Sequence, residues 1–186
     1  MTLVDLGIPG VVSALDHHDL VAPPVASALA AWLAADPDVA RIGVVAIDPA
    51  IADTAAFVAH YQVPADSSIN CVVVEGVRNG QSRVIAACIP ADTRADVNQL
   101  IRKRLDARKC SFMKMDDAVA GSGMEYGGIT PIGLPADWQV LIDARVEGLD
   151  AVIIGAGIRG AKLIVPGALL ARLPGAEVVE GLGKPA

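Results

Sequence analysis

The sequence predicts an α/β fold in which helices pack against a mixed β-sheet. Segments with helix and strand character alternate along the chain, and two long apolar segments are joined by Asn79–Gly80, the dipeptide that most strongly favours a tight hairpin. A hairpin makes its strands antiparallel, which disfavours a purely parallel, doubly wound sheet. The chain has 186 residues, 53% of them hydrophobic, which is enough for one domain with a sizeable core.

Residues 1–38 are expected to form an N-terminal helical arm ahead of a domain that spans 39–186. Pro23–Pro24 opens a helix over about 25–35, since proline fits the first turn of a helix. Trp32 on this helix packs either on the domain itself or on a partner, and the sequence leaves both interpretations open.

The remaining elements follow from local patterns. Strands are expected where β-branched and apolar residues cluster, at 41–47, 69–77, 82–89, 110–113, 140–143, 151–154, 161–165 and 177–179. Further helices are expected at 53–62, 92–108, 116–121 and 167–173. The longest of them is predicted because Asp92 or Thr93 can cap it and the apolar residues behind recur at helical spacing.

The charge pattern gives two competing interpretations. A net charge of −6 argues against general nucleic-acid binding. Six of the fifteen basic residues nevertheless lie within thirteen positions: Arg102, Lys103, Arg104, Arg108, Lys109 and Lys114. This basic cluster is either the solvated end of a helix, where cations are favourable, or a surface for an anionic partner.

The cysteine and histidine pattern indicates no metal site. The three cysteines are far apart and form no CxxC pair, and the three histidines show no zinc-ligand spacing. This usage suits a reducing cytoplasm. The N-terminal residues make a poor signal peptide, and no apolar run is long enough to span a bilayer. We therefore expect a cytoplasmic protein that needs no cofactor and binds no membrane.

A GxGxxG pattern at 155–160 suggests a dinucleotide site, but its context opposes that interpretation. In a dinucleotide site the pattern opens a helix, whereas here it precedes the β-branched segment 161–165. We interpret it as a strand–turn–strand connection whose glycines supply positive φ. The turn presents Arg159, whose guanidinium suits a phosphate or a carboxylate.

The stretch MEYGGITPIGLP, residues 124–135, is a stiff loop with little side-chain cover, and we call it the glycine loop. The N–H groups of Gly127 and Gly128 can point at a ligand without obstruction, and successive exposed N–H groups bind anions. Beside an ester, such donors would stabilise the oxyanion that forms when water attacks. A rigid, buried crossover without chemistry is the alternative interpretation.

Residues 104–135 resemble the YbaK/prolyl-tRNA synthetase-associated domain family of aminoacyl-tRNA deacylases. In that family a basic helix end precedes a Ser-Phe strand, a small helix that ends in glycine, and a loop of the form G-G-[VI]-[ST]-P-x-G. The corresponding residues here are Ser111–Phe112, Gly123 and 127–133, and a later Gly-x-Arg-Gly turn matches 157–160. Order and spacing match from about residue 41 to the end, so the arm lies outside the resemblance.

The resemblance implies a mixed, partly barrel-like sheet and a trans-editing activity. This activity hydrolyses the ester that joins a wrong amino acid to the 3′ acceptor end of a tRNA. Catalytic roles are implied for Gly127, Gly128 and Asn70, and substrate contacts for Cys71, Tyr126, Thr130, Pro131, Gly155, Gly157 and Arg159. The basic cluster becomes the RNA-binding surface. Mischarged tRNA, with or without a tRNA synthetase, becomes the expected partner, rather than DNA.

One position departs from the family pattern. Family members usually carry a lysine at the start of a strand where this chain has Asn70, and no cation replaces it nearby in the sequence. An asparagine can donate two hydrogen bonds but cannot neutralise a phosphate. Two hypotheses therefore remain. The chain is either a deacylase or a binding module without catalysis that holds a small molecule, an RNA end or a protein partner.

Overall fold

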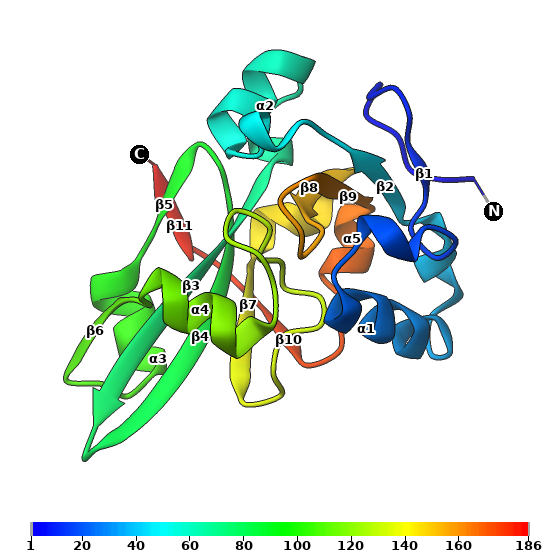
Figure 1. Ribbon diagram of the computed structural model, residues 1–186. Helices are drawn as coiled ribbons and strands as arrows, with labels where there is room; N and C mark the ends of the chain where they lie inside the picture. The colour runs from blue at the N-terminus through cyan, green and yellow to red at the C-terminus, as the bar shows by residue number, and fades with distance from the viewer. Residues whose placement is uncertain (1, 186) are drawn as a thin grey trace.

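The structure is a computed structural model that describes residues 2–185, in which three β-sheets pack with five α-helices (Figure 1). One sheet has four antiparallel strands in the order β1-β2-β9-β8. These strands are β1 (Val12–Ser13), β2 (Gly43–Ala46), β9 (Ala161–Val165) and β8 (Val152–Gly155). A two-stranded sheet pairs β5 (Thr93–Ala95) with β11 (Gly183–Pro185).

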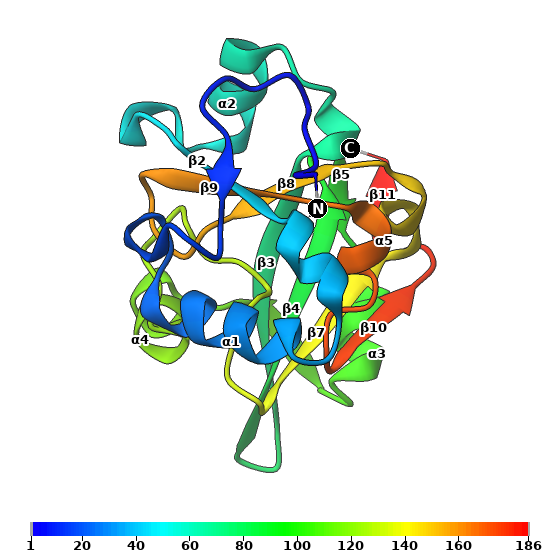
Figure 2. The same ribbon diagram turned by 90° about the vertical axis from the view of Figure 1, so that its right-hand side faces the viewer.

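The largest sheet is mixed, as the sequence predicted. Its strand order is β10-β7-β4-β3-β6, with β10, β7 and β4 parallel and β4, β3 and β6 antiparallel. The strands are β10 (Ala176–Val179), β7 (Trp138–Asp143), β4 (Gln81–Pro90), β3 (Ile69–Arg78) and β6 (Lys109–Phe112). Within residues 2–185 the sheets do not close into a barrel. The strands of the two larger sheets instead run across one another (Figure 2).

The hairpin of β3 and β4 confirms the strongest local prediction. The two strands pair without interruption from Ile69 opposite Pro90 to Arg78 opposite Gln81. Asn79 and Gly80 form the turn with φ of 52° and 77°. Two consecutive left-handed residues match the twist of the flanking strands, which is why the Asn-Gly signal was sufficient here.

The helices are α1 (Pro23–Leu33), α2 (Thr54–Tyr61), α3 (Arg102–Arg104), α4 (Met115–Ser122) and α5 (Gly167–Leu170). Helix α1 buries Val25, Leu29 and Trp32 in the main core, to which both larger sheets contribute. Trp32 is therefore intramolecular core, one of its two predicted placements. The arm, expected to be helical, also contributes strand β1, which pairs with β2. The domain boundary after residue 38 stays a prediction.

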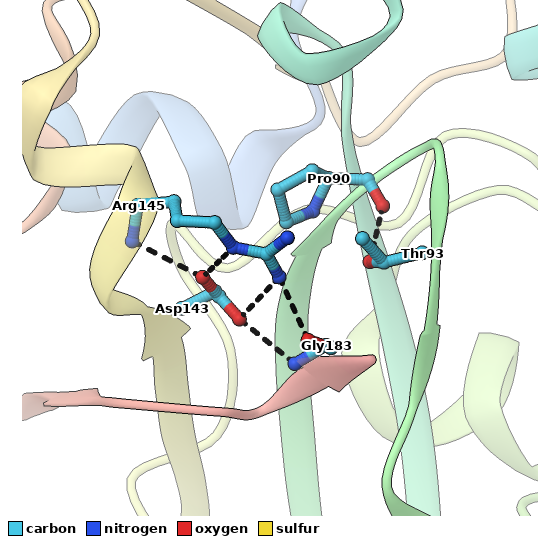
Figure 3. Close-up of polar contacts among 5 residues, drawn as sticks. All are labelled: Pro90, Thr93, Asp143, Arg145 and Gly183. Carbon is cyan, nitrogen blue, oxygen red and sulfur yellow. Dashed lines mark hydrogen bonds and ion pairs between the residues drawn. The ribbon is translucent and has the colours of Figure 1, made fainter. Parts of the chain in front are cut away.

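The helix expected over 92–108 is wrong in its first part. Strand β5 occupies its start, and the Thr93 hydroxyl donates to the Pro90 carbonyl at 2.6 Å instead of capping a helix (Figure 3). Asp96 is the actual N-cap. The helical stretch begins with a wide π-helical turn at Val97–Ile101 and continues into α3. The partner of β5 is the distant C-terminal strand β11, and no local pattern reveals a pairing of that kind.

A buried carboxylate ties β11 to the largest sheet (Figure 3). Asp143, at the end of β7, is 1% exposed. It accepts hydrogen bonds from Arg145 Nε at 2.7 Å, from Arg145 Nη2 at 2.9 Å and from the Gly183 N–H at 2.8 Å. Burial alone would raise the pKa of Asp143, but these hydrogen bonds outweigh it and lower the pKa below its ordinary value.

Candidate active site

A pocket of about 410 Å³ opens among the start of α2, the start of β3, the segment from β6 to α4, the glycine loop and the paired ends of β8 and β9. That volume is within the range of small-molecule sites. Five residues singled out from the sequence line it together: Asn70, Cys71, Tyr126, Gly127 and Gly155. The fold thus brings the glycine loop to the same cavity as the start of β3, where Asn70 occupies the position of the family lysine. More than fifty positions separate the two segments in the sequence.

The glycine loop turns sharply at its two adjacent glycines. The Gly128 N–H donates to the Glu125 carbonyl at 3.0 Å, and Gly127 has φ +79°, a left-handed conformation that favours glycine. Because this turn uses the Gly128 N–H, that group is not a free donor to a ligand. The Gly127 N–H has no acceptor within residues 2–185. Gly127, which lines the pocket, is therefore the better placed donor of the pair.

Backbone contacts hold the glycine loop against the β8–β9 turn. The Gly157 N–H donates to the Gly128 carbonyl at 2.8 Å, and the Glu125 N–H donates to the Gly157 carbonyl at 2.8 Å. A Cβ at Gly128 would lie 2.5 Å from the backbone of the opposing turn, so glycine permits this close approach. The GxGxxG pattern is a strand–turn–strand connection, as predicted, with Gly157 at φ +80°.

Arg159 lies next to the pocket but does not line it. Its Nε donates to the Pro49 carbonyl at 3.1 Å, and its Nη2 is 3.6 Å from an Asp53 carboxylate oxygen. Its guanidinium carbon lies 5.7 Å from the centre of the Tyr126 ring, a cation–π distance. A Cβ at Gly127 would collide with Arg159 Nη1. Arg159 thus positions two residues of the pocket wall.

Four other residues implied by the resemblance lie behind the pocket wall: Gly128, Thr130, Pro131 and Gly157. Thr130 and Pro131 are buried. The arm supports this layer, because the Ala22 N–H donates to the Ala156 carbonyl at 3.0 Å. A Cβ at Gly157 would lie 2.5 Å from the Ala22 Cβ. Close packing, rather than an open face toward the pocket, characterises these four positions.

Asn70 offers hydrogen-bond donors to the pocket but no charge. Its Oδ1 accepts a hydrogen bond from the Thr54 hydroxyl at 2.6 Å, which orients the amide. The NH₂ group of Asn70 has no acceptor within residues 2–185. Strand β6 pairs with β3 only over Val74–Val77, so β6 does not cover the edge of β3 beside Asn70 and the pocket.

Lys162 is the charged residue of the pocket that sequence reasoning missed. It lies on β9 and is 7% exposed. Its Nζ is 5.9 Å from the centre of the Phe57 ring, and it makes no hydrogen bond or ion pair with any residue in 2–185. Burial lowers the pKa of Lys162, although the nearby carboxylate of Asp53 partly opposes this. The available signal was a lysine inside the apolar strand AKLIV.

The basic cluster is exposed and does not line the pocket. Arg104 forms an ion pair with Glu177 on β10, across the largest sheet. Lys114 comes closest to the pocket along the chain, because its neighbours Met113 and Met115 both line it. The six cations therefore surround the helix α3 region and the start of α4 rather than forming one rim.

Cys71 packs against Cys88 on the neighbouring strand, its register partner. A hydrogen bond with Cys71, together with complete burial, raises the pKa of the Cys88 thiol. Cys71 itself is only partly buried and contributes to the pocket wall as well as packing against the main core.

The chain belongs to the aminoacyl-tRNA editing domain family, whose sequence model matches residues 48–173. No curated protein sequence matches the chain. The fold is shared with the hypothetical protein APE2540, at TM-score 0.70 and 20% identity, over 84% of this chain and 99% of that one. It is also shared with "a putative trans-editing enzyme for prolyl tRNA synthetase", at TM-score 0.68 and 14% identity, over 89% of this chain and 99% of that one. At these identities the structural likeness shows the fold alone.

No helix within residues 2–185 combines the length and apolar character needed to cross a membrane. In the same range, no group of three or more His, Cys, Asp or Glu side chains is arranged to hold a metal ion.

Proposed function

We propose that this protein is an aminoacyl-tRNA deacylase that removes a wrong amino acid from the 3′ end of a tRNA. The observation that carries the proposal is the pocket lined by both Gly127 and Asn70, whose backbone N–H and amide NH₂, respectively, have no acceptor within residues 2–185. Ester hydrolysis needs fixed donors of this kind at the carbonyl oxygen. Membership of the editing-domain family supports the same substrate class.

In the proposed reaction, water attacks the carbonyl carbon of the ester and the Gly127 N–H donates to the oxyanion that forms. The tetrahedral intermediate collapses and the bond between the carbonyl carbon and the ribose oxygen breaks. The proton lost by water passes to that oxygen, so a free amino acid and a tRNA with a free 3′ hydroxyl are released. Removing one such donor typically lowers the rate about 100-fold or more.

Two exposed aromatic rings give the acceptor end of the RNA a place to bind. Phe112 and Tyr126 line the pocket and are 63% and 60% exposed. Stacking of a base on an aromatic side chain contributes about 1–3 kcal/mol. In this proposal the rings hold the terminal bases and the basic cluster contacts phosphates farther from the ester. A cytoplasmic location and association with a tRNA synthetase belong to the same proposal.

The alternative is a binding module that kept the pocket and lost the chemistry. The observation that favours it is Asn70. The resemblance implies a lysine at this position, and the neutral asparagine lacks the charge that such a lysine would bring to the pocket. The two functions differ in one respect that can be measured directly, namely turnover of a charged tRNA.

The test is deacylation of a panel of mischarged tRNAs, with alanyl- and cysteinyl-tRNA for proline first. The wild type is compared with Gly127→Ala, whose Cβ would collide with Arg159, and with the control Gly148→Ala, whose Cβ would meet nothing within 4 Å. The proposal expects hydrolysis by the wild type and the control, and a rate about 100-fold lower in Gly127→Ala. A wild type that binds these tRNAs and hydrolyses none would establish the binding module instead.

A further inference from the structure

Lys162 is a charge that neither the fold nor the proposed reaction explains. Its neighbours in the sheet are Val45 and Gly155, and the Phe57 ring lies over it from α2. An ammonium group taken out of water without a partner is strongly unfavourable. Within residues 2–185 Lys162 makes no hydrogen bond or ion pair, and only the Phe57 ring, at a cation–π distance, faces its charge, yet it lines an open pocket. A buried charge of this kind in a cleft indicates a functional group.

The polar groups around Lys162 are mostly donors. The Asp53 side chain makes no capping hydrogen bond at the start of α2, so the first N–H groups of that helix lack a side-chain acceptor. Helix N-termini attract anions through these groups. The amide NH₂ of Asn70 is a further unpartnered donor of the same pocket.

The one acidic side chain of the pocket is partly engaged elsewhere. Asp53 is largely exposed and lies 3.6 Å from Arg159 Nη2; within residues 2–185 it forms no ion pair with Lys162, although its carboxylate partly opposes the lowering of the Lys162 pKa. A ligand that satisfies Lys162, Asn70 and the start of α2 together must therefore present an acceptor, and a negative charge is the acceptor that a buried ammonium favours most.

We infer that Lys162 binds an anionic group of the substrate and supplies from β9 the positive charge that position 70 lacks. The inference rests on the proposed function for the identity of the substrate. Two groups of an aminoacylated RNA end carry the required charge: the phosphate of the terminal nucleotide and the carboxylate of an acidic amino acid. Both would be held by the same ammonium group.

Binding of non-hydrolysable ligands tests this inference separately from catalysis. The probes are four 3′-amino-3′-deoxyadenosines that carry glutamate or glutamine through an amide, each with and without a 5′-phosphate. Calorimetric titration of the wild type is compared with Lys162→Gln and with the control Lys184→Gln, whose lysine pairs with Asp96 and lies outside this pocket. Unfolding curves of all three establish that each is folded.

The wild type and the control are expected to prefer a charged probe over its neutral counterpart by about tenfold or more, and Lys162→Gln is expected to lose that preference. A preference in the glutamate–glutamine pair identifies the amino-acid carboxylate, and one in the phosphate pair identifies the nucleotide. The double variant Asn70→Lys/Lys162→Gln is expected to regain part of the preference for charged probes that Lys162→Gln loses. No binding, no preference in the wild type, or a preference that survives in Lys162→Gln would overturn the inference.

The outcomes separate this inference from the proposed function. If the protein prefers charged probes through Lys162 but hydrolyses no aminoacyl-tRNA, the anion site is supported and the deacylase activity is rejected. Hydrolysis that is equally fast in the wild type and Lys162→Gln, with no charge preference, keeps the enzyme and rejects the anion site.

Discussion

Asp143 and Lys162 are both charged, both on strands and both almost fully buried, at 1% and 7% exposure. Asp143 accepts hydrogen bonds from Arg145 and Gly183 and so links β7 of the largest sheet to β11 of the two-stranded sheet (Figure 3). Lys162 makes no hydrogen bond or ion pair within residues 2–185. The first charge is fully paired inside the fold, whereas the second is left open to a pocket.

The difference separates a structural charge from a functional one. A buried charge that is paired and hydrogen-bonded stabilises the contacts around it, and removing one partner is destabilising. A buried charge without an ion-pair partner destabilises the fold, and in a cleft it indicates a functional site. Opposite responses to mutation are therefore expected at the two positions.

The largest effect on stability is expected at Asp143. Asp143→Ala removes the acceptor of the Gly183 N–H and of Arg145 Nε, leaving the Arg145 guanidinium bonded only to the Gly183 carbonyl, and should lower the free energy of unfolding by about 2–4 kcal/mol. Urea unfolding followed by circular dichroism measures it. The control is Glu177→Gln, which loses an exposed ion pair with Arg104 and weakens an exposed hydrogen bond from Gln139, and should change stability far less. Equal losses of stability in both variants would contradict the claim that Asp143 is a structural charge.

The next largest effect is expected at Gly127, in the glycine loop that lines the same pocket as Lys162. Gly127→Ala forces a side chain into a left-handed conformation and against Arg159 Nη1. Strain of this kind costs about 1–2 kcal/mol per residue, and the displaced donor should slow deacylation about 100-fold. Gly175→Ala has the same positive φ but meets nothing within 4 Å. This control variant should be strained to a similar extent but should deacylate tRNA at the wild-type rate. If Gly175→Ala were also slow, backbone strain at any site would explain the lower rate.

The pH dependence of stability should differ between the two charges. Because the pKa of Asp143 is lowered in the fold, its stabilisation is complete above the unfolded pKa of about 4 and is lost as pH falls through the folded value. Asp143→Asn should therefore approach the wild type in acid. Because burial lowers the pKa of Lys162, wild-type stability should rise as pH increases from that folded value toward about 10.4. Lys162→Met should lack this rise, and unfolding at a series of pH values measures both.

The sequence predicted those features that local chemistry determines. Asn79–Gly80 identified the hairpin, and the β-branched segment after Gly160 correctly predicted a strand where a dinucleotide fingerprint would open a helix. The glycine loop was recognised from its own residues. Each of these signals lies within a few positions of the element it specifies.

Features that depend on distant pairing were missed. Strand β5 was taken for helix because its partner β11 lies at the other end of the chain. Lys162 was missed because it lies far from Asn70 in the sequence and on a strand of the other large sheet, and only the fold brings both residues to one pocket. The free N–H of Gly127 and the engaged N–H of Gly128 could be told apart only from the turn itself.

The most direct test of the central claim measures stability and ligand binding together in Lys162→Met. Replacing an unpaired buried charge with an apolar side chain of similar length should stabilise the fold by about 0.5–2 kcal/mol at neutral pH. The same variant should bind the preferred charged probe about tenfold or more weakly. A variant that is more stable but binds worse would establish Lys162 as a charge kept for a ligand. A variant that is less stable than the wild type, or that binds the probe equally well, would contradict the account.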